Sequence, residues 1–181
     1  MKKLAIAAIG LFLAGSAAAQ IPGADSLKEK ATAAAAETGG AAYLAAKAAF
    51  NKAVKDIPFA YNSAELNLDD PKYSVAGVNV SEFMKNTVIP ALVKVVELAP
   101  ADKQVTITGH ASRKGSEEAT ETFQGNVALS KARAEAVVNF ITANSNLPAG
   151  RFMVVAAGSS APRSGVEPES DKNCRVSIKM D

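Results

Sequence analysis

The stretch from Asn126 to Val138, N-V-A-L-S-K-A-R-A-E-A-V-V, restricts the fold of this chain more than any other. Its apolar residues recur at helical spacing, so it predicts one amphipathic helix that ends near residues 144–146. The side chains expected on its buried face are Val127, Ala134, Val137, Val138 and Ile141. Arg133 lies near the start of this helix. A guanidinium binds carboxylates through paired hydrogen bonds, so Arg133 is the first candidate for a binding residue.

Short strand-like runs lie on both sides of this helix. Residues 105–108 alternate apolar and hydroxyl side chains, as a half-buried strand does. Residues 151–157 and 173–180 predict two further strands. An earlier strand is expected at 57–61, with Pro58 near its start, where proline is tolerated.

A second helix is expected to run to Leu98, with Asn86 or Thr87 as its cap and Pro90 in its first turn. Residues 67–80 predict a loop or insertion. The resulting order is β-α-β-α-β-β. Parallel strand pairs need helical crossovers, so the chain predicts an α+β sandwich with both helices on one face of a mixed four-stranded sheet.

An alanine-rich segment precedes this domain. Alanine is the best helix former, and Gly39-Gly40 is expected to divide residues 24–55 into two helical pieces. The second piece carries an apolar seam of two heptads, which is too short to predict a coiled coil. The seam either packs on its own domain or mediates self-association. Its members are Tyr43, Ala46, Phe50, Ala53 and Ile57.

The first twenty residues have the pattern of a signal peptide. Lys2-Lys3 precede a short apolar run and three alanines, so we expect cleavage after Ala19 or Gln20, with an uncleaved anchor as the alternative. The predicted divisions are a signal peptide at 1–20, a helical spacer or docking segment at 21–56 and a domain at 57–181. No later stretch is long enough to span a membrane.

Charge and cysteine content exclude several classes of protein. Without Lys2 and Lys3, the 20 basic residues fall to 18, which equals the 18 acidic ones. A neutral chain with scattered charges does not predict nucleic-acid or anionic-lipid binding. Cys174 is the only cysteine, so no intramolecular disulfide can form. It shares strand parity with Val176 and is expected to face the core, with an intermolecular disulfide as the alternative.

No pattern predicts a catalytic or metal centre. His110 is the only histidine and is expected to pack or hydrogen-bond. Ser130 lacks the glycines of a nucleophile elbow and is expected to be structural. Asp69-Asp70 precede a proline, as in a solvated turn. The chain therefore predicts no cofactor and no enzyme.

Five segments in order resemble the OmpA-like family, the peptidoglycan-binding domain shared with Pal lipoproteins and MotB-type stator proteins. They begin at Phe59 (F-A-Y-N-S-A-E-L), Thr106 (T-I-T-G-H), Asn126 (N-V-A-L-S-K-A-R-A-E-A-V), Gly158 (G-S-S-A-P) and Asn173 (N-C-R-V). The resemblance covers most of residues 59–180.

The resemblance implies a binding site for diaminopimelate, a residue of the peptidoglycan stem peptide. The family's helix arginine, which binds a ligand carboxylate, matches Arg133. The family usually has threonine and aspartate after its glycine-histidine pair, where this chain has Ala111 and Ser112. Its final motif usually carries arginine where this chain has Cys174. The implied ligand-binding residues are Arg133, Ser112, Ala111, His110, Asn126 and Arg175.

Loss of the aspartate predicts weaker binding. A charge-assisted hydrogen bond contributes roughly 1.5–3 kcal/mol, which is about tenfold to a hundredfold in affinity. Glu117 or Glu118 could supply the missing charge. Asn173 is expected to fix the entry of the last strand through backbone contacts. Arg175 could either border the pocket or lie on plain surface.

Three classes of function follow. The first is an exported periplasmic module that binds peptidoglycan and uses residues 24–57 to dock on another envelope protein, with outer-membrane association as an open alternative. The second is an envelope structural or interaction protein that kept the fold and lost the ligand. The third, an enzyme acting on the wall, has no motif in its favour.

Overall fold

The computed structural model describes residues 24–180. The predicted signal peptide, residues 1–20, lies outside the described residues. The chain divides into two compact units, Met1–Glu37 and Thr38–Asp181. Of the first unit, only the N-terminal part of helix α1 (Ala24–Ala53) is described. None of the helices in residues 24–180 is long and apolar enough to cross a membrane.

Helix α1 runs through Gly39 and Gly40 without a break, so the predicted division into two pieces is wrong. Each glycine costs about 1 kcal/mol relative to alanine in a helix, and the alanine-rich flanks offset this cost. The seam packs on its own domain, as the first alternative predicted, because Tyr43 and Phe50 are buried. Ala53 is exposed and does not take part.

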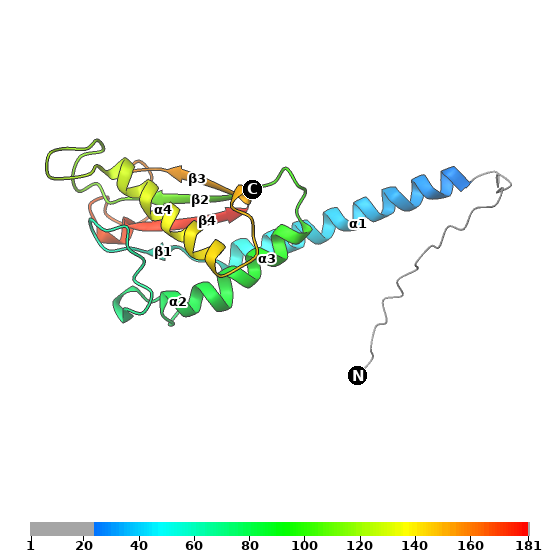
Figure 1. Ribbon diagram of the computed structural model, residues 1–181, viewed down its shortest axis with the longest axis horizontal. Helices are drawn as coiled ribbons and strands as arrows, with labels where there is room; N and C mark the ends of the chain where they lie inside the picture. The colour runs from blue at the N-terminus through cyan, green and yellow to red at the C-terminus, as the bar shows by residue number, and fades with distance from the viewer. Residues whose placement is uncertain (1–23, 181) are drawn as a thin grey trace. The chain divides into compact units, whose positions relative to one another are not determined.

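The sheet is mixed and four-stranded, as predicted (Figure 1). Its strands are β1 (Ile57–Pro58), β2 (Val105–His110), β3 (Phe152–Ala156) and β4 (Arg175–Met180), in the order β1-β4-β2-β3. Strands β2 and β3 are parallel, and β4 is antiparallel to both β1 and β2. Strand β1 is shorter than predicted, although the Phe59 amide still donates to the Cys174 carbonyl at 2.8 Å.

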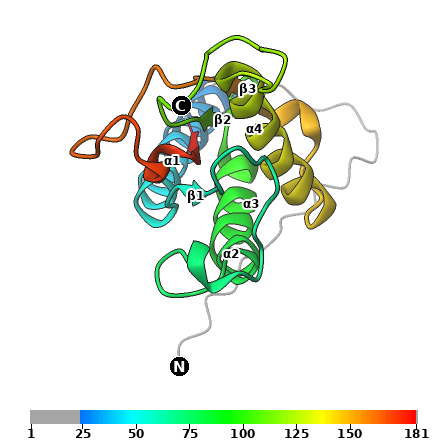
Figure 2. The same cartoon turned by 90° about the vertical axis from the view of Figure 1, so that its left-hand side faces the viewer.

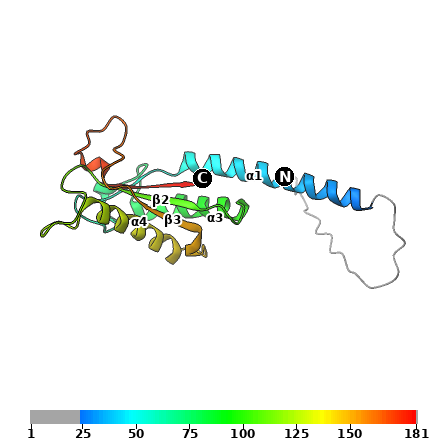
Figure 3. The same ribbon diagram turned by 90° about the horizontal axis from the view of Figure 1, so that it is seen from above.

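Helices α3 (Ile89–Leu98) and α4 (Asn126–Ala143) lie on one face of the sheet (Figure 3). Helix α4 contacts β2, β3 and β4, and its buried residues include Ala134, Val137 and Ile141, as predicted. Val138 is half-buried. Val127 is 41% exposed, so its predicted burial is wrong. It lies against Gly158, which has no side chain to cover it.

The helix that precedes β2 begins earlier than predicted. It starts as α2 (Val80–Phe83), capped by Asn79, whose Oδ1 accepts from the Glu82 amide at 2.7 Å. A π-helical segment, Met84–Val88, joins α2 to α3 (Figure 2). Asn86 and Thr87 are therefore not caps. The π segment ends just before Pro90, which has no N–H to donate. The change in hydrogen-bond spacing at this point allows the helix to continue through the proline.

Candidate functional site

Arg133 is fully buried on α4, and its guanidinium joins the ends of two strands. Its Nε donates to the Ser63 carbonyl, Nη1 to the His110 carbonyl and Nη2 to the Ala60 carbonyl, each at 2.8 Å. The Phe59 ring lies beside it, with the guanidinium carbon 5.7 Å from the ring centroid. Helix α4 thus fixes the loop after β1 and the end of β2 through one side chain.

No described carboxylate forms an ion pair with Arg133. Burial lowers the pKa of Arg133, while Cys174 and Asp171 act in the opposite direction. A buried charge without a counter-ion costs several kcal/mol, of which carbonyl dipoles recover only a part. A carboxylate brought by a ligand would neutralise this charge.

The guanidinium is covered in this conformation. Two of its three carbonyl partners belong to residues 60–63, and Arg133 lines neither of the two described cavities. A ligand can reach it only if this loop moves. Asn62, in the middle of the loop, has a φ of 52°, a left-handed conformation that few residues other than glycine adopt.

Ser112 and Ala111 follow directly after β2 and are buried. The Ala111 amide donates to the Gly158 carbonyl at 2.7 Å, which holds this turn against the loop after β3. The Ser112 hydroxyl is buried without a hydrogen-bond partner. An unpaired buried hydroxyl is unfavourable by about 1–3 kcal/mol, so a ligand group that pairs with it would bind more tightly.

Asn126 and Glu117 fasten the loop that precedes α4. The Asn126 amide nitrogen donates to the carbonyls of Lys114 at 3.2 Å and Gly115 at 3.4 Å. The Glu117 carboxylate accepts from the backbone amide and hydroxyl of Ser159. Glu117 therefore does not supply the charge that Ser112 lacks, and Glu118 is exposed.

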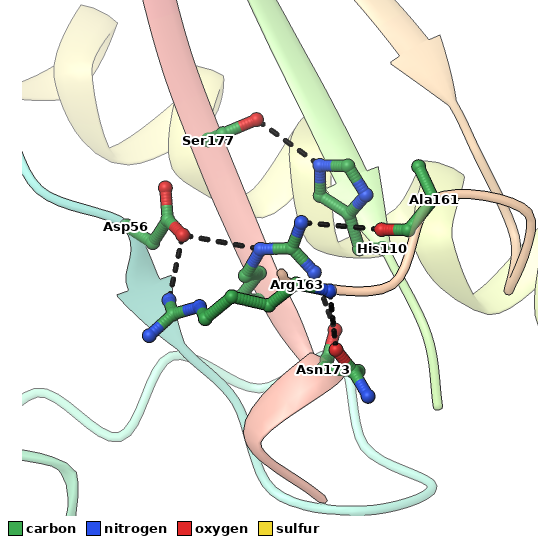
Figure 4. Close-up of polar contacts among 7 residues, drawn as sticks. Asp56, His110, Ala161, Arg163, Asn173 and Ser177 are labelled. Carbon is green, nitrogen blue, oxygen red and sulfur yellow. Dashed lines mark hydrogen bonds and ion pairs between the residues drawn. The ribbon is translucent and has the colours of Figure 1, made fainter. Parts of the chain in front are cut away.

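Arg175 belongs to a second polar cluster, together with Asp56, Arg163 and Ala161, which Figure 4 labels. Strand alternation directs Val176 into the core and Arg175 to the opposite face of the sheet. Arg175 Nε and Arg163 Nη2 both bind Asp56 Oδ2, at 3.1 Å and 2.6 Å. Arg175 Nη2 also donates to the Ala161 carbonyl at 3.2 Å. Arg175 is thus neither plain surface nor beside Arg133.

The His110 side chain belongs to the same second cluster, although its carbonyl binds Arg133. Its Nε2 lies 3.1 Å from the Ser177 hydroxyl, and its Nδ1 is buried without a partner. Burial and the Arg175 charge lower the pKa of His110 to about 4, against an opposing effect of Asp56. His110 is therefore neutral at pH 7 and acts as a hydrogen-bonding residue, as predicted.

Three further predictions are confirmed. Asn173 fixes the entry to β4, since its amide nitrogen donates to the Glu167 and Pro168 carbonyls and its oxygen accepts from the Arg163 amide. The Ser130 hydroxyl is structural, because it accepts from the Gly158 amide at 3.0 Å. Cys174 is 2% exposed and faces the core. No group of three metal-ligating side chains occurs in residues 24–180.

The sequence did not reveal Asp56 and Arg163, although both belong to the second cluster. They are 107 positions apart, and the fold alone brings them together. Arg163 lies in a loop rich in glycine, serine and proline, where a single basic residue predicts only a solvated surface. No local pattern could have identified this pair.

The family is settled by comparison with known proteins. The model of the OmpA family matches residues 78–175, more than half of the chain. This chain belongs to the OmpA family. OmpA-like domains typically bind peptidoglycan in the periplasm, and their members are generally binding or structural proteins rather than enzymes.

Among solved structures similar to this chain, the one at a TM-score of 0.50 supports the same fold. The peptidoglycan-associated lipoprotein of Burkholderia pseudomallei is 16% identical, with 72% of this chain and 93% of that chain covered and a TM-score of 0.50. The OmpA-like domain of FopA1 from Francisella tularensis is 23% identical, with 70% and 73% covered and a TM-score of 0.47. The C-terminal domain of Helicobacter pylori MotB is 17% identical, with 71% and 86% covered and a TM-score of 0.48. No curated protein matches this chain.

Proposed function

We propose that this protein is exported to the periplasm and binds peptidoglycan non-covalently through the diaminopimelate carboxylate of the stem peptide. One observation carries the proposal: Arg133 is a fully buried guanidinium that donates to three carbonyl oxygens and forms no ion pair with a described carboxylate. A ligand carboxylate would replace the loop carbonyls of Ala60 and Ser63 and form the charge-assisted pair that the resting protein lacks.

The neighbouring residues have defined parts in this proposal. The Ser112 hydroxyl, unpaired in the resting protein, donates to the ligand where the family's aspartate would accept from it. The backbone of Ala111 and the carbonyl of His110 shape the wall beside Arg133, and Asn126 holds the loop in front of it. Arg175 lies on the opposite face of the sheet, so it has no direct contact with the ligand in this proposal. Binding is weaker than in relatives that keep the aspartate.

The second candidate is an envelope interaction protein that no longer binds the wall. The complete covering of Arg133 by three carbonyls favours it, because each nitrogen of the guanidinium already has a partner. In this candidate the helical segment up to residue 57 docks on another envelope protein. Leu44 is 62% exposed on α1, and it provides an apolar contact point for such a partner.

Retention on purified peptidoglycan sacculi distinguishes the two candidates. The proteins compared are the wild type, Ser112→Asp, Ser112→Asn and Arg133→Lys, each first shown to be folded by circular dichroism. Asparagine matches aspartate in size but lacks its charge, so the pair isolates the electrostatic effect. We expect Ser112→Asp to bind about tenfold to a hundredfold more tightly than wild type, and Ser112→Asn to change little.

Arg133→Lys is expected to reduce retention at least tenfold, since an ammonium cannot form the paired hydrogen bonds of a guanidinium. If the folded wild type is not retained above a non-binding control protein, the peptidoglycan-binding proposal is wrong and the second candidate is favoured. Equal retention of Ser112→Asp and Ser112→Asn would remove this site from the binding surface.

A further inference from the structure

A cavity of about 940 Å³ lies beside β1 and the start of β4. Its lining includes Asp56, Arg163 and Arg175 of the second polar cluster, together with Lys72 and Tyr73. Arg133 and Ser112 do not line it. The cavity adjoins the proposed diaminopimelate site at Phe59 and Ala60, which contact the Arg133 guanidinium from the other side. An inference about its basic residues does not depend on the proposed function, because Arg133 and Ser112 take no part in it.

The lining of this cavity is strongly basic. Five basic side chains face two acidic ones, and one of these acids, Asp171, is already paired with Lys114 at 2.8 Å. The other acid, Asp56, serves two guanidiniums through a single oxygen. The basic residues are Lys55, Lys72, Arg163, Lys172 and Arg175. An excess of positive charge in a concave surface attracts anions.

Arg163 is the basic group best placed to bind a ligand. Its side chain is 45% exposed, and it reaches Asp56 through Nη2 alone (Figure 4). No hydrogen bond from its Nη1 or Nε occurs within residues 24–180. Arg175 is instead 10% exposed at its side chain and holds three oxygen partners. Arg163 can therefore turn toward an anion while Arg175 keeps Asp56 in place.

The cavity is also larger and more apolar than a site for a bare inorganic ion. Its volume lies in the range of small-molecule sites, which is about 300–1,000 Å³. The apolar lining includes Pro58, Phe59 and Val75. The Lys72 ammonium lies 5.4 Å from the centroid of the Tyr73 ring, so a cation and an aromatic face adjoin there.

We propose that this cavity binds an acidic saccharide, with its carboxylate on Arg163 and Lys72 and its sugar ring against Tyr73. The C–H groups on the face of a sugar ring pack on an aromatic ring, and its hydroxyls bond to polar groups around it. The ligand class is a uronic acid or a similar carboxylated sugar.

Isothermal titration calorimetry of the full chain with glucuronate, glucose and inorganic phosphate tests this proposal. Glucose keeps the ring without the charge, and phosphate keeps the charge without the ring. We expect glucuronate to bind at least tenfold more tightly than either. Arg163→Gln is expected to weaken glucuronate binding about tenfold, as loss of one charge-assisted hydrogen bond does.

Lys131→Gln is the matched control, because it removes one exposed positive charge on α4 that does not line the cavity. This variant is expected to bind glucuronate like the wild type. No measurable binding of glucuronate would overturn the proposal, as would equal affinities of Arg163→Gln and Lys131→Gln. Phosphate binding as tight as glucuronate binding would show a simple anion site and would overturn the saccharide assignment.

Discussion

Arg133 and Arg175 are the two buried arginines of the described chain, and their charges are balanced in different ways. Arg175 shares a carboxylate, Asp56, with Arg163, whereas Arg133 donates to three carbonyl oxygens and forms no ion pair with a described carboxylate. The sequence identified both arginines as candidates. It could not identify the partners of Arg133, because two of them lie more than 60 positions away and accept its hydrogen bonds through backbone oxygens, which every residue has.

The stability of the protein depends on the shape of the Arg133 side chain. Arg133→Lys keeps the charge but cannot serve three carbonyls in a fixed plane, so we expect the free energy of unfolding to fall by about 2–3 kcal/mol. Urea denaturation followed by circular dichroism measures this change. The control is Arg163→Lys, which is 45% exposed at its side chain and is expected to change the value by less than about 0.5 kcal/mol. Equal effects would contradict the role of the carbonyl contacts.

His110 gives the folded state a specific pH dependence. Its pKa is about 4 in the folded protein, against an ordinary value of 6.5. The unfolded chain therefore binds a proton that the folded chain rejects between these two values, and stability falls as the pH decreases from 6.5 to 4. We expect His110→Gln, which keeps a hydrogen-bonding side chain, to show a smaller fall over this window in urea unfolding. Parallel curves for wild type and variant would contradict the assignment.

At the scale of elements, helix α4 and strand β2 position the candidate site through close backbone packing. A Cβ atom on Gly109 would lie 1.8 Å from the Ser130 carbonyl oxygen, so only glycine fits at this contact. Ser130 is one helical turn before Arg133. The approach of α4 to β2 therefore sets where the guanidinium meets the His110 carbonyl.

Gly109→Ala should separate α4 from β2. We expect the free energy of unfolding to fall by about 3 kcal/mol or more, because the backbone of both elements must shift. Gly150→Ala is the matched control, since nothing lies within 4 Å of its added Cβ. It is expected to leave the stability within about 0.5 kcal/mol of wild type. Thermal melts of the two variants measure the difference, and a Gly109→Ala melt like that of Gly150→Ala would refute the close contact.

Helix α4 and strand β2 were predictable from local sequence, and the elements set by tertiary contacts were not. Strand β2 alternates buried and half-buried side chains, and α4 is rich in alanine, the best helix former. The start of the preceding helix was missed, since a π turn before Pro90 has no sequence signature. The continuity of α1 through Gly39 was not predicted, because the glycine pair alone favours a break. The alanine-rich sequence on both sides stabilises the helix enough to continue through it.

At the scale of the whole molecule, part of α1 belongs to the core of the domain. Residues 38–53 fall in the same compact unit as the sheet, and they contribute Tyr43, Ala46 and Phe50 to its core. The prediction that the seam packs on its own domain depended on the spacing of these residues. Which strands and helices it meets was not predictable, because the seam itself carries no information on its partner.

Truncations test this division. Removal of residues 1–37 is expected to leave the melting temperature of the domain nearly unchanged. Removal of residues 1–53 deletes the buried Phe50 and Tyr43 side chains and is expected to destabilise the fold by at least about 3–5 kcal/mol, the cost of losing one large buried aromatic. Differential scanning calorimetry compares the two proteins. Equal melting temperatures would show that α1 is a spacer along its whole length.

Part of the candidate site was predictable from the sequence. The sequence did not predict that its residues would lie on two opposite faces of the sheet. The motif residues proposed for the site are Arg133, which donates to the His110 carbonyl, and Ala111 and Ser112, which follow His110 directly after β2. The side chains of Arg175 and His110 were predicted at the same site and lie on the other face, as strand parity requires. The basic cavity beside them depends on loops that carry no periodic pattern.

The proposed binding of the diaminopimelate carboxylate by Arg133 can be observed in solution. The most direct measurement is an NMR titration of the isotope-labelled protein with diaminopimelate, observed at the Arg133 side-chain Nε–H and the Ser112 backbone amide. We expect saturable shifts at both signals, and shifts at residues 60–63 as the carbonyls of Ala60 and Ser63 are displaced. Signals of Arg133 and Ser112 that stay unchanged at saturating ligand, in a protein shown to be folded, would contradict it.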